Sequence, residues 1–146
     1  MRLFAFILLV VPFTLVGQHD LFHQGEIAFD GNDIVSYYEE ASPLKGKPQF
    51  EHKHAEGVVL QFANQSNLEK FVANPEKYMP AYDGWCALAI AQNSYIRPDF
   101  NTYKVQEGKL LFFEVRAFFN GKTFWEKDPD INKIVADKKY NALKEN

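Results

Sequence analysis

The pattern of apolar and polar positions predicts two β-hairpins. Residues 50–54 alternate between large and charged side chains, which is the period of a β-strand, and residues 58–62 form an apolar run after a turn that contains glycine. Residues 104–105 and 109–113 repeat this arrangement around a Glu-Gly turn. Each pair of strands is close in sequence, so we expect both hairpins to be antiparallel.

Other segments have helical spacing. Asp33 precedes one of them and is placed to accept hydrogen bonds from the free amides of its first turn. Ser66 to Glu69 fits a capping box, and Leu68, Phe71 and Val72 would form one apolar face behind it. The segments predicted to be helical are residues 34–38, 66–73, 76–78, 83–92, 115–125 and 129–143. Together these elements predict a small α+β domain with short β-hairpins packed against several α-helices.

The first seventeen residues differ from the rest of the chain. Arg2 is the only charged residue before Asp20, and an apolar run between them ends at Gly17. This pattern is typical of a secretory signal peptide over residues 1–17. An uncleaved N-terminal membrane anchor is the alternative, and it would be the only membrane attachment. We therefore expect an exported protein, periplasmic or extracellular, with a tail over residues 18–26 and one domain over residues 27–146.

Composition narrows the class of protein. The chain has 146 residues, of which 47% are hydrophobic and 16% aromatic, so it needs a core to bury them. Its net charge of -3 argues against a nucleic-acid partner, which favours a basic face. A single cysteine, Cys86, excludes an internal disulfide and any all-thiolate metal site within one chain.

Four ordered segments carry a family resemblance. Residues 31–38, 62–78, 82–91 and 105–112 resemble the signatures of exported YHS-domain proteins, and the similarity extends from about residue 27 to residue 128. The resemblance implies a YHS-like fold and a metal-binding module. The metal-type pattern of that family has cysteines at the positions of Ala63 and Asn67, and another near the opening signature, and all three are missing here. Neither alanine nor an amide replaces a soft anionic sulfur.

Cys86 is the remaining soft ligand and the first candidate site residue. At the start of the helix predicted after Asp83 it would feel the positive end of the helix dipole, which favours the thiolate. His52 and His54 lie on one face of a predicted strand, and with Cys86 they would suit copper or zinc. The alternatives are that Cys86 packs as a small apolar side chain and that the histidines line an edge of the core. His19 and His23 are expected to belong to the N-terminal tail.

Three functions follow from these candidates. The leading hypothesis is an exported, non-catalytic YHS-type module that binds copper or zinc through Cys86, His52 and His54. A thiol-based redox protein is the second, although the chain has no resolving cysteine. The third is a module with an inert cysteine whose aromatic cluster forms a pocket for an apolar ligand, a protein or a second copy in a homodimer. That cluster comprises Phe112, Phe113, Phe118, Phe119, Phe124 and Trp125.

Overall fold

The computed structural model describes residues 21–54 and 57–145. The predicted signal peptide and residues 18–20 of the predicted tail lie outside the described residues. Within the described part of the chain, no helix is both long enough and apolar enough to cross a membrane.

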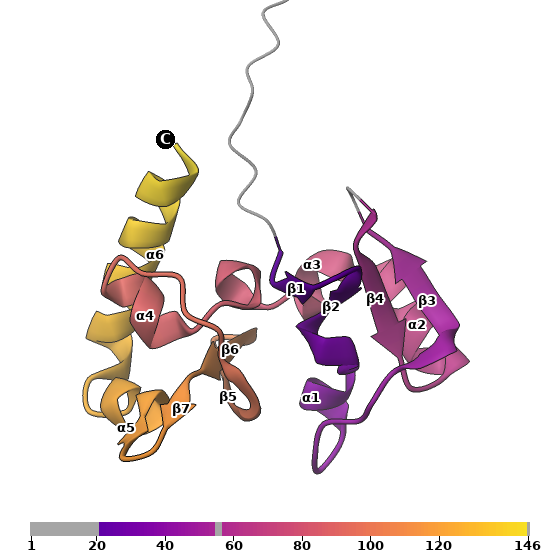
Figure 1. The fold of residues 1–146 in the computed structure, drawn as a ribbon, viewed down its shortest axis with the longest axis horizontal. Helices are drawn as coiled ribbons and strands as arrows, with labels where there is room; N and C mark the ends of the chain where they lie inside the picture. The colour runs from indigo at the N-terminus through magenta and orange to yellow at the C-terminus, as the bar shows by residue number, and fades with distance from the viewer. Residues whose placement is uncertain (1–20, 55–56, 146) are drawn as a thin grey trace, which may run out of the picture.

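The first half of the chain forms a small mixed sheet with short helices around it, at the right in Figure 1. The strand order is β1-β2-β4-β3, in which β2 and β4 are parallel and the other neighbours are antiparallel. Its elements are β1 (His23–Gln24), β2 (Ile27–Ala28), η1 (Phe29–Gly31), α1 (Ser36–Glu39), β3 (Lys47–Lys53), β4 (Val59–Phe62), α2 (Gln65–Ala73) and α3 (Pro75–Tyr78). The predicted hairpin over residues 50–62 is confirmed as β3 and β4.

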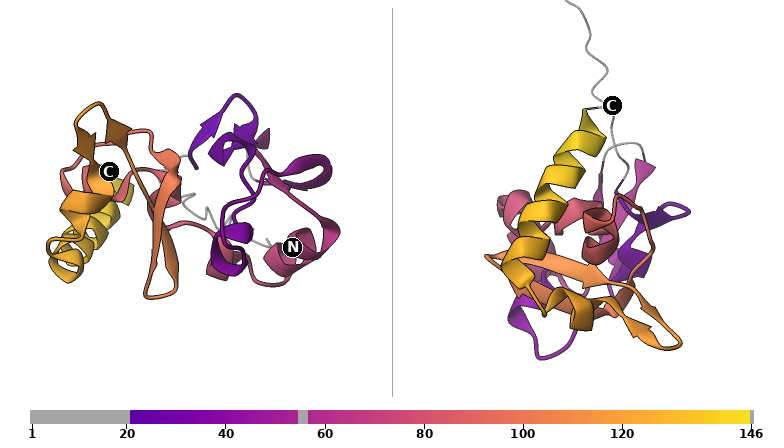
Figure 2. Two further views of the ribbon diagram at one scale, coloured as in Figure 1. Left: turned by 90° about the horizontal axis from the view of Figure 1, so that it is seen from below. Right: turned by 90° about the vertical axis from the view of Figure 1, so that its left-hand side faces the viewer.

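The second half is built around a long hairpin and three helices, at the left in both Figure 1 and the left-hand view of Figure 2. The predicted hairpin of β5 and β6 is confirmed, with its turn at Glu107 and Gly108. The elements are η3 (Ala81–Gly84), α4 (Ala87–Ala91), β5 (Asp99–Gln106), β6 (Lys109–Phe113), β7 (Val115–Arg116), β8 (Phe119–Asn120), α5 (Gly121–Trp125) and α6 (Pro129–Lys144). The small α+β domain expected from the sequence is thus the observed fold class.

Strand β6 divides the core into two clusters. Leu110 and Phe112 belong to the cluster that covers the first-half sheet, whereas Leu111 and Phe113 belong to the cluster under α4, α5 and α6. Successive side chains of a strand point to opposite faces, so four consecutive apolar residues serve two cores. All four are fully buried. This explains why β6 is a continuous apolar run and not an alternating one.

A buried carboxylate joins the first-half elements. Asp33 is fully buried, and its Oδ1 accepts hydrogen bonds from the backbone amides of Val35 at 2.9 Å and Ser36 at 3.3 Å. Its Oδ2 accepts from the amide of Ala63 at 2.8 Å and from Asn67 Nδ2 at 2.7 Å. Asp33 therefore accepts from amides of this segment as predicted, but α1 begins at Ser36 and not at residue 34, with Val35 as its N-cap. The same side chain also holds the β4–α2 junction.

Helix α6 is docked by two tyrosine–aspartate hydrogen bonds. Tyr82 Oη donates to Asp137 Oδ1 at 2.9 Å, and Tyr140 Oη donates to Asp83 Oδ2. The two rings meet edge to face with centroids 5.4 Å apart. The prediction of a helix over residues 129–143 is confirmed, and these contacts tie it to η3.

Two sequence expectations about helix starts are wrong. Residues 83–92 do not form one helix, because α4 begins only at Ala87 and residues 82–84 have left-handed backbone. Ser66 does not cap α2, since Asn64 is the N-cap and its Oδ1 accepts from the Asn67 amide at 2.9 Å. Val72 is 55% exposed and does not belong to the buried face.

The prediction of a helix over residues 115–125 is also wrong in its first part. Residues 115–120 form the β7–β8 hairpin, and only residues 121–125 are helical. Asn120 ends the hairpin and caps α5, since its Oδ1 accepts from the amides of Lys122 and Thr123. Phe118 and Trp125 consequently do not share a helical stripe; Phe118 is exposed and Trp125 is buried.

We expect Asp33→Ala to lower the free energy of unfolding by about 3–5 kcal/mol, because four buried donors lose their acceptor together. Asp33→Asn keeps one acceptor oxygen and is expected to cost less. Urea denaturation measures both, with Glu40→Ala as the control for loss of an exposed carboxylate. A loss in Asp33→Ala no greater than in the control would contradict this role.

A second prediction concerns alkaline pH. Burial is the largest cause that raises the pKa of Tyr82 and of Tyr140, and Asp137 and Asp83 respectively raise them further. Because an unfolded tyrosine titrates near about 10, the folded state holds these protons more tightly. Their contribution to stability is fully present below that pH and is lost as the pH rises towards the folded-state pKa. We expect the free energy of unfolding of Tyr82→Phe and of Tyr140→Phe, measured by urea titration, to fall less steeply than that of the wild type as the pH rises into the alkaline range. An equal slope would contradict the role of these two tyrosines.

Candidate functional site

Cys86 is a core residue in the second half of the molecule. It is fully buried in the cluster that also contains Trp125 and Ala136. Its Sγ accepts a hydrogen bond from the backbone amide of Glu114 at 3.3 Å, and its own amide donates to the Ile96 carbonyl at 3.0 Å. The residue is the N-cap of α4, a helix of five residues. The sulfur thus lies among backbone amides and has no exposed surface.

Burial opposes the thiolate expected at Cys86. Burial is the largest influence and raises the pKa of the thiol, and hydrogen bonds from the amides of Glu114, Ala89 and Leu88 offset this only in part. Asp83 was expected to cap the helix, but it has left-handed backbone and bonds to α6 instead. A desolvated thiol is a poor nucleophile and a poor metal ligand.

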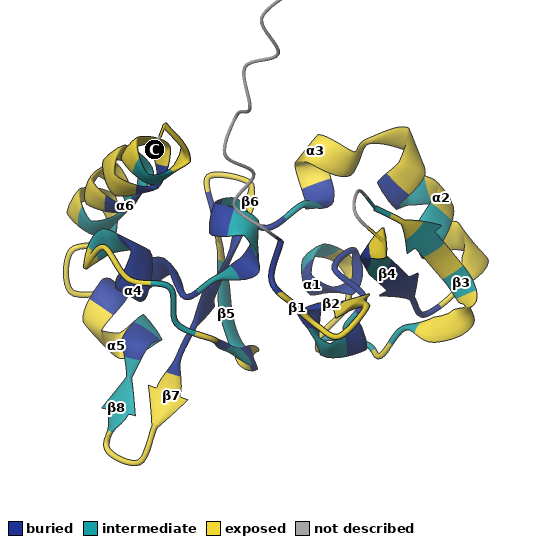
Figure 3. Ribbon diagram, turned by 45° about the horizontal axis from the view of Figure 1, so that its top comes forward, coloured by how far each residue is buried: buried dark blue, intermediate teal, exposed yellow. Residues whose placement is uncertain are grey.

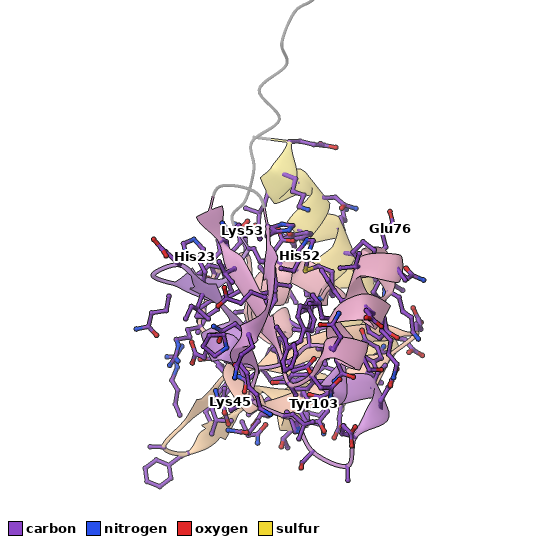
Figure 4. All side chains as sticks on the ribbon, turned by 90° about the vertical axis from the view of Figure 1, so that its right-hand side faces the viewer. His23, Lys45, His52, Lys53, Glu76 and Tyr103 are labelled. Carbon is purple, nitrogen blue, oxygen red and sulfur yellow. The ribbon has the colours of Figure 1, made fainter. Side chains whose placement is uncertain are left out.

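The structure does not bring the predicted metal ligands together. His52 lies on β3, where its ring meets Phe71 of the other core cluster at 5.2 Å between centroids, and it is labelled in the upper part of Figure 4. His54 follows the strand, and its amide donates to the Val58 carbonyl at 2.7 Å. Figure 1 shows β3 and α4, the helix next to Cys86, at opposite sides of the molecule. Among the residues that the structure describes, no three His, Cys, Asp or Glu side chains are grouped to hold a metal ion.

The remaining histidine of the predicted tail that the structure describes is His23. Its Nδ1 lies 2.6 Å from the Gly25 carbonyl in the β1–β2 turn, so His23 belongs to the sheet and not to a free tail. His19 lies outside the described residues.

A hydrogen-bonded carboxylate occupies the place where the YHS resemblance puts cysteines. Ala63 and Asn67 stand at those positions, and both donate to the same oxygen, Oδ2 of Asp33. The distances are 2.8 Å and 2.7 Å, so the two residues do converge on one point. What they surround is a protein side chain that is already fully buried and hydrogen bonded.

Two turns of the same sequence type have strained backbone. Phe29, Asp30 and Gly31 have φ values of 52°, 53° and 70°, and residues 82–84, Tyr-Asp-Gly, have φ values of 56°, 51° and 83°. Non-glycine residues rarely adopt this left-handed region, and each costs on the order of 1–3 kcal/mol. The turns touch, because a Cβ at Gly84 would overlap the ring of Phe29. Strain of this kind gathers at functional sites.

The first of these turns borders a polar cavity of about 300 Å³. The walls come from four separate segments of the chain: the strained turn, the loop before β3, the segment that leads into β5, and the start of β7. The lining residues are Asp30, Asn32, Lys45, Arg97, Pro98, Asp99, Phe100, Asn101 and Val115. A second cavity of about 310 Å³ is also lined by Asp30, together with Gln24, Ile27, Gly31 and Gln61.

Asp30 is the electrostatic centre of this region. Arg97 Nη2 donates to its Oδ2, and Lys45 Nζ donates to its backbone carbonyl at 3.0 Å. Its Oδ1 is buried and has no hydrogen-bond partner among the described residues. Asp99 is satisfied locally, since its Oδ2 accepts from Thr102 Oγ1 at 2.9 Å and its Oδ1 from the Asn101 amide at 3.0 Å. Two cations therefore contact Asp30, Arg97 at its incompletely paired carboxylate and Lys45 at its backbone carbonyl.

The sequence contained a signal for this site that residue chemistry did not reveal. Phe-Asp-Gly at 29–31 and Tyr-Asp-Gly at 82–84 have the same aromatic-Asp-Gly pattern, and a glycine after an aspartate is typical of a tight turn. A comparison of the two triplets would have marked both turns. The approach of Arg97 and Lys45 to Asp30 could not be found in this way, because 67 and 15 residues separate them.

Comparison of the chain with protein-family models, with curated proteins and with solved structures finds no match. The YHS resemblance therefore stays a prediction from the sequence, and the site is interpreted from its geometry.

The burial of the Cys86 sulfur predicts a slow reaction with thiol reagents. We expect native Cys86 to react with a chromogenic disulfide reagent at least about 100-fold more slowly than a free thiol, because the reagent needs an accessible thiolate and this thiol is buried with a raised pKa. The rate should rise to that of an ordinary thiol in denaturant.

The matched control places an exposed thiol in the same chain. Phe118→Cys in a Cys86→Ala background replaces a fully exposed residue, so it should react as fast in the native protein as in denaturant. Fast native reaction of Cys86 at neutral pH would restore the thiol hypotheses.

Proposed function

We propose that this protein is an exported, non-catalytic module of the YHS type that binds a small polar molecule beside Asp30, with Cys86 as a core residue. The observation that carries the proposal is the meeting of Arg97 and Lys45 on a strained, incompletely paired aspartate at the border of a cavity of about 300 Å³. This volume is at the lower end of the range for small-molecule sites.

The charges of the cavity indicate the ligand class. Arg97 has an exposed side chain whose guanidinium can donate to a carboxylate through two parallel hydrogen bonds, and Lys45 adds a second positive charge. Asp30 and Asp99 balance these charges and favour a donor group on the same ligand. A small carboxylic acid with an amino or hydroxyl group satisfies both requirements. A ligand with only one sign of charge would meet like charges in the wall.

The residues around the cavity support binding and not catalysis. Its described lining contains no cysteine, serine or histidine, and its lysine and aspartate side chains are already held by hydrogen bonds or an ion pair. The thiol that the redox hypothesis needs is in a different cluster, under α4 and α6. The arrangement offers ion pairing and hydrogen bonds, which hold a ligand without changing it.

Metal handling through Cys86 is not part of this proposal. The described residues supply a protonated, buried thiol and two histidines on another element, which do not fit a copper or zinc site. The predicted aromatic pocket is not used either. Phe112, Phe113 and Trp125 are core residues, and the cavity lies at the polar turn instead.

We expect L-serine and L-lactate, each with a carboxylate and a donor group, to perturb the backbone NMR signals of Asn32, Arg97 and Asn101 in a saturable way. Acetate, which has a carboxylate but no donor group, and putrescine, which is only cationic, should perturb these signals at least about tenfold less at the same concentration. The titration uses the full chain.

Variants test which residues bind these probes. Arg97→Ala should weaken the response to the carboxylate probes at least about tenfold, and Arg97→Lys should weaken it less because the ammonium keeps the charge but not the paired donors. Lys139→Ala removes an exposed cation of α6 and is the control. Absence of a saturable response to either carboxylate probe, or an equal loss in the control, would refute the proposed site.

A further inference from the structure

The β7–β8 hairpin projects from the second half of the molecule. Val115 pairs with Asn120 and Arg116 with Phe119, so only Ala117 and Phe118 form the loop. Phe118 is 105% exposed, which means that no neighbour covers its ring. Figure 3 shows the loop exposed at the end of the hairpin, away from both cores. The hairpin is anchored where Gly121 donates to the Glu114 carbonyl at 2.9 Å.

Other apolar side chains surround this loop. We call Val115, Phe118, Phe119 and Phe124 the aromatic tip. Val115 and Phe124 are each more than 40% exposed, and the rings of Phe119 and Phe124 stack with centroids 4.9 Å apart. Single exposed apolar residues are common on protein surfaces, but a contiguous group marks an interaction surface. Phe119 is half-buried against the second core cluster, whereas Val115, Phe118 and Phe124 are exposed, unlike the fully buried Phe112, Phe113 and Trp125.

The charge around the aromatic tip is opposite in sign to that of the whole chain. Residues 115–125 contain Arg116 and Lys122 and no carboxylate, whereas the chain carries a net charge of -3. Lys127 Nζ lies 4.4 Å from the centroid of the Phe124 ring. Glu126 is the next acidic residue in the sequence, after the tip has ended.

The acidic residue before the tip, Glu114, offsets part of the Arg116 charge from a buried position. Glu114 is 6% exposed, and its Oε2 lies 2.6 Å from Arg116 Nε as an ion pair without the alignment of a hydrogen bond. The Arg116 side chain itself remains exposed. The tip therefore presents aromatic rings together with cations.

We propose that the aromatic tip binds the surface of an anionic lipid bilayer, with Phe118 inserted at the level of the headgroups. Aromatic side chains are favoured at that depth, and arginine and lysine beside them pair with lipid phosphates. A two-residue loop with a fully exposed ring is convex and narrow, which suits insertion between headgroups better than docking on a folded partner. The aromatic tip shares Val115 with the lining of the ligand cavity, but this inference does not rest on ligand binding there.

The test places an environment-sensitive fluorophore on the tip of the full chain. A nitrobenzoxadiazole label at Ala117→Cys, in a Cys86→Ala background whose fold is checked by circular dichroism, is mixed with vesicles of phosphatidylcholine with or without phosphatidylglycerol. The matched control carries the label at Val72→Cys, an exposed position on α2 in the other half of the molecule. Because the apolar N-terminal segment is present in both proteins, the difference between the two labels reports insertion of the tip.

We expect a blue shift of the tip label on the anionic vesicles and at most a small shift of the control label. Phe118→Ser should weaken this response at least about tenfold, because it removes the ring that would leave water. In an otherwise native chain, Phe118→Trp should show emission quenched by brominated anionic lipids, which tests insertion without the label or the Cys86 substitution.

Four results would overturn the proposal. They are no shift of the tip label on anionic vesicles, an equal shift of both labels, an equal response to vesicles without phosphatidylglycerol, and a shift that appears without vesicles as protein concentration rises. The second result would assign membrane binding to the N-terminal segment, and the last would assign the tip to contact with a second copy.

Discussion

The carboxylate of Asp33 is the interaction on which the first half of the molecule depends. It lies where three segments meet, and all four of its hydrogen bonds come from groups that would otherwise be buried without an acceptor. The strained turn at residues 29–31 immediately precedes it, so a fixed Asp33 also fixes the position of Asp30. The geometry of the cavity is thus set by a buried group that does not line it.

The sequence predicted those elements whose stability is local. The two longer hairpins have strand periodicity and turn residues in their own segments, and α6 has proline at its start and a long helical pattern. The failures occurred where tertiary contacts override local preference. Residues 82–84 leave the helical region because Tyr82 and Asp83 bond to α6, and residues 115–120 form a hairpin despite a pattern that is compatible with a helix.

The candidate site was harder to predict than the fold. Sequence reasoning selects residues by their chemistry, and it selected the one cysteine, which is covered by residues from α5 and α6. The cavity is lined instead by residue types that are common on protein surfaces. Asp30, Lys45 and Arg97 form a candidate site only because the fold brings them close together. Nothing local in the sequence specifies that approach. The predicted aromatic cluster is also divided in the structure: three of its members are buried in the core, Phe119 packs against the core at its edge, and Phe118 and Phe124 are exposed.

The two faces of β6 have a consequence for evolution and for folding. A deletion or insertion of one residue within the strand would exchange the side chains that enter the two cores, so both would be mispacked by a single event. Neither half can therefore vary its packing against this strand without the other. We therefore expect the two cores to fold and unfold in one cooperative transition, although the ribbon in Figure 1 has two visibly separate halves.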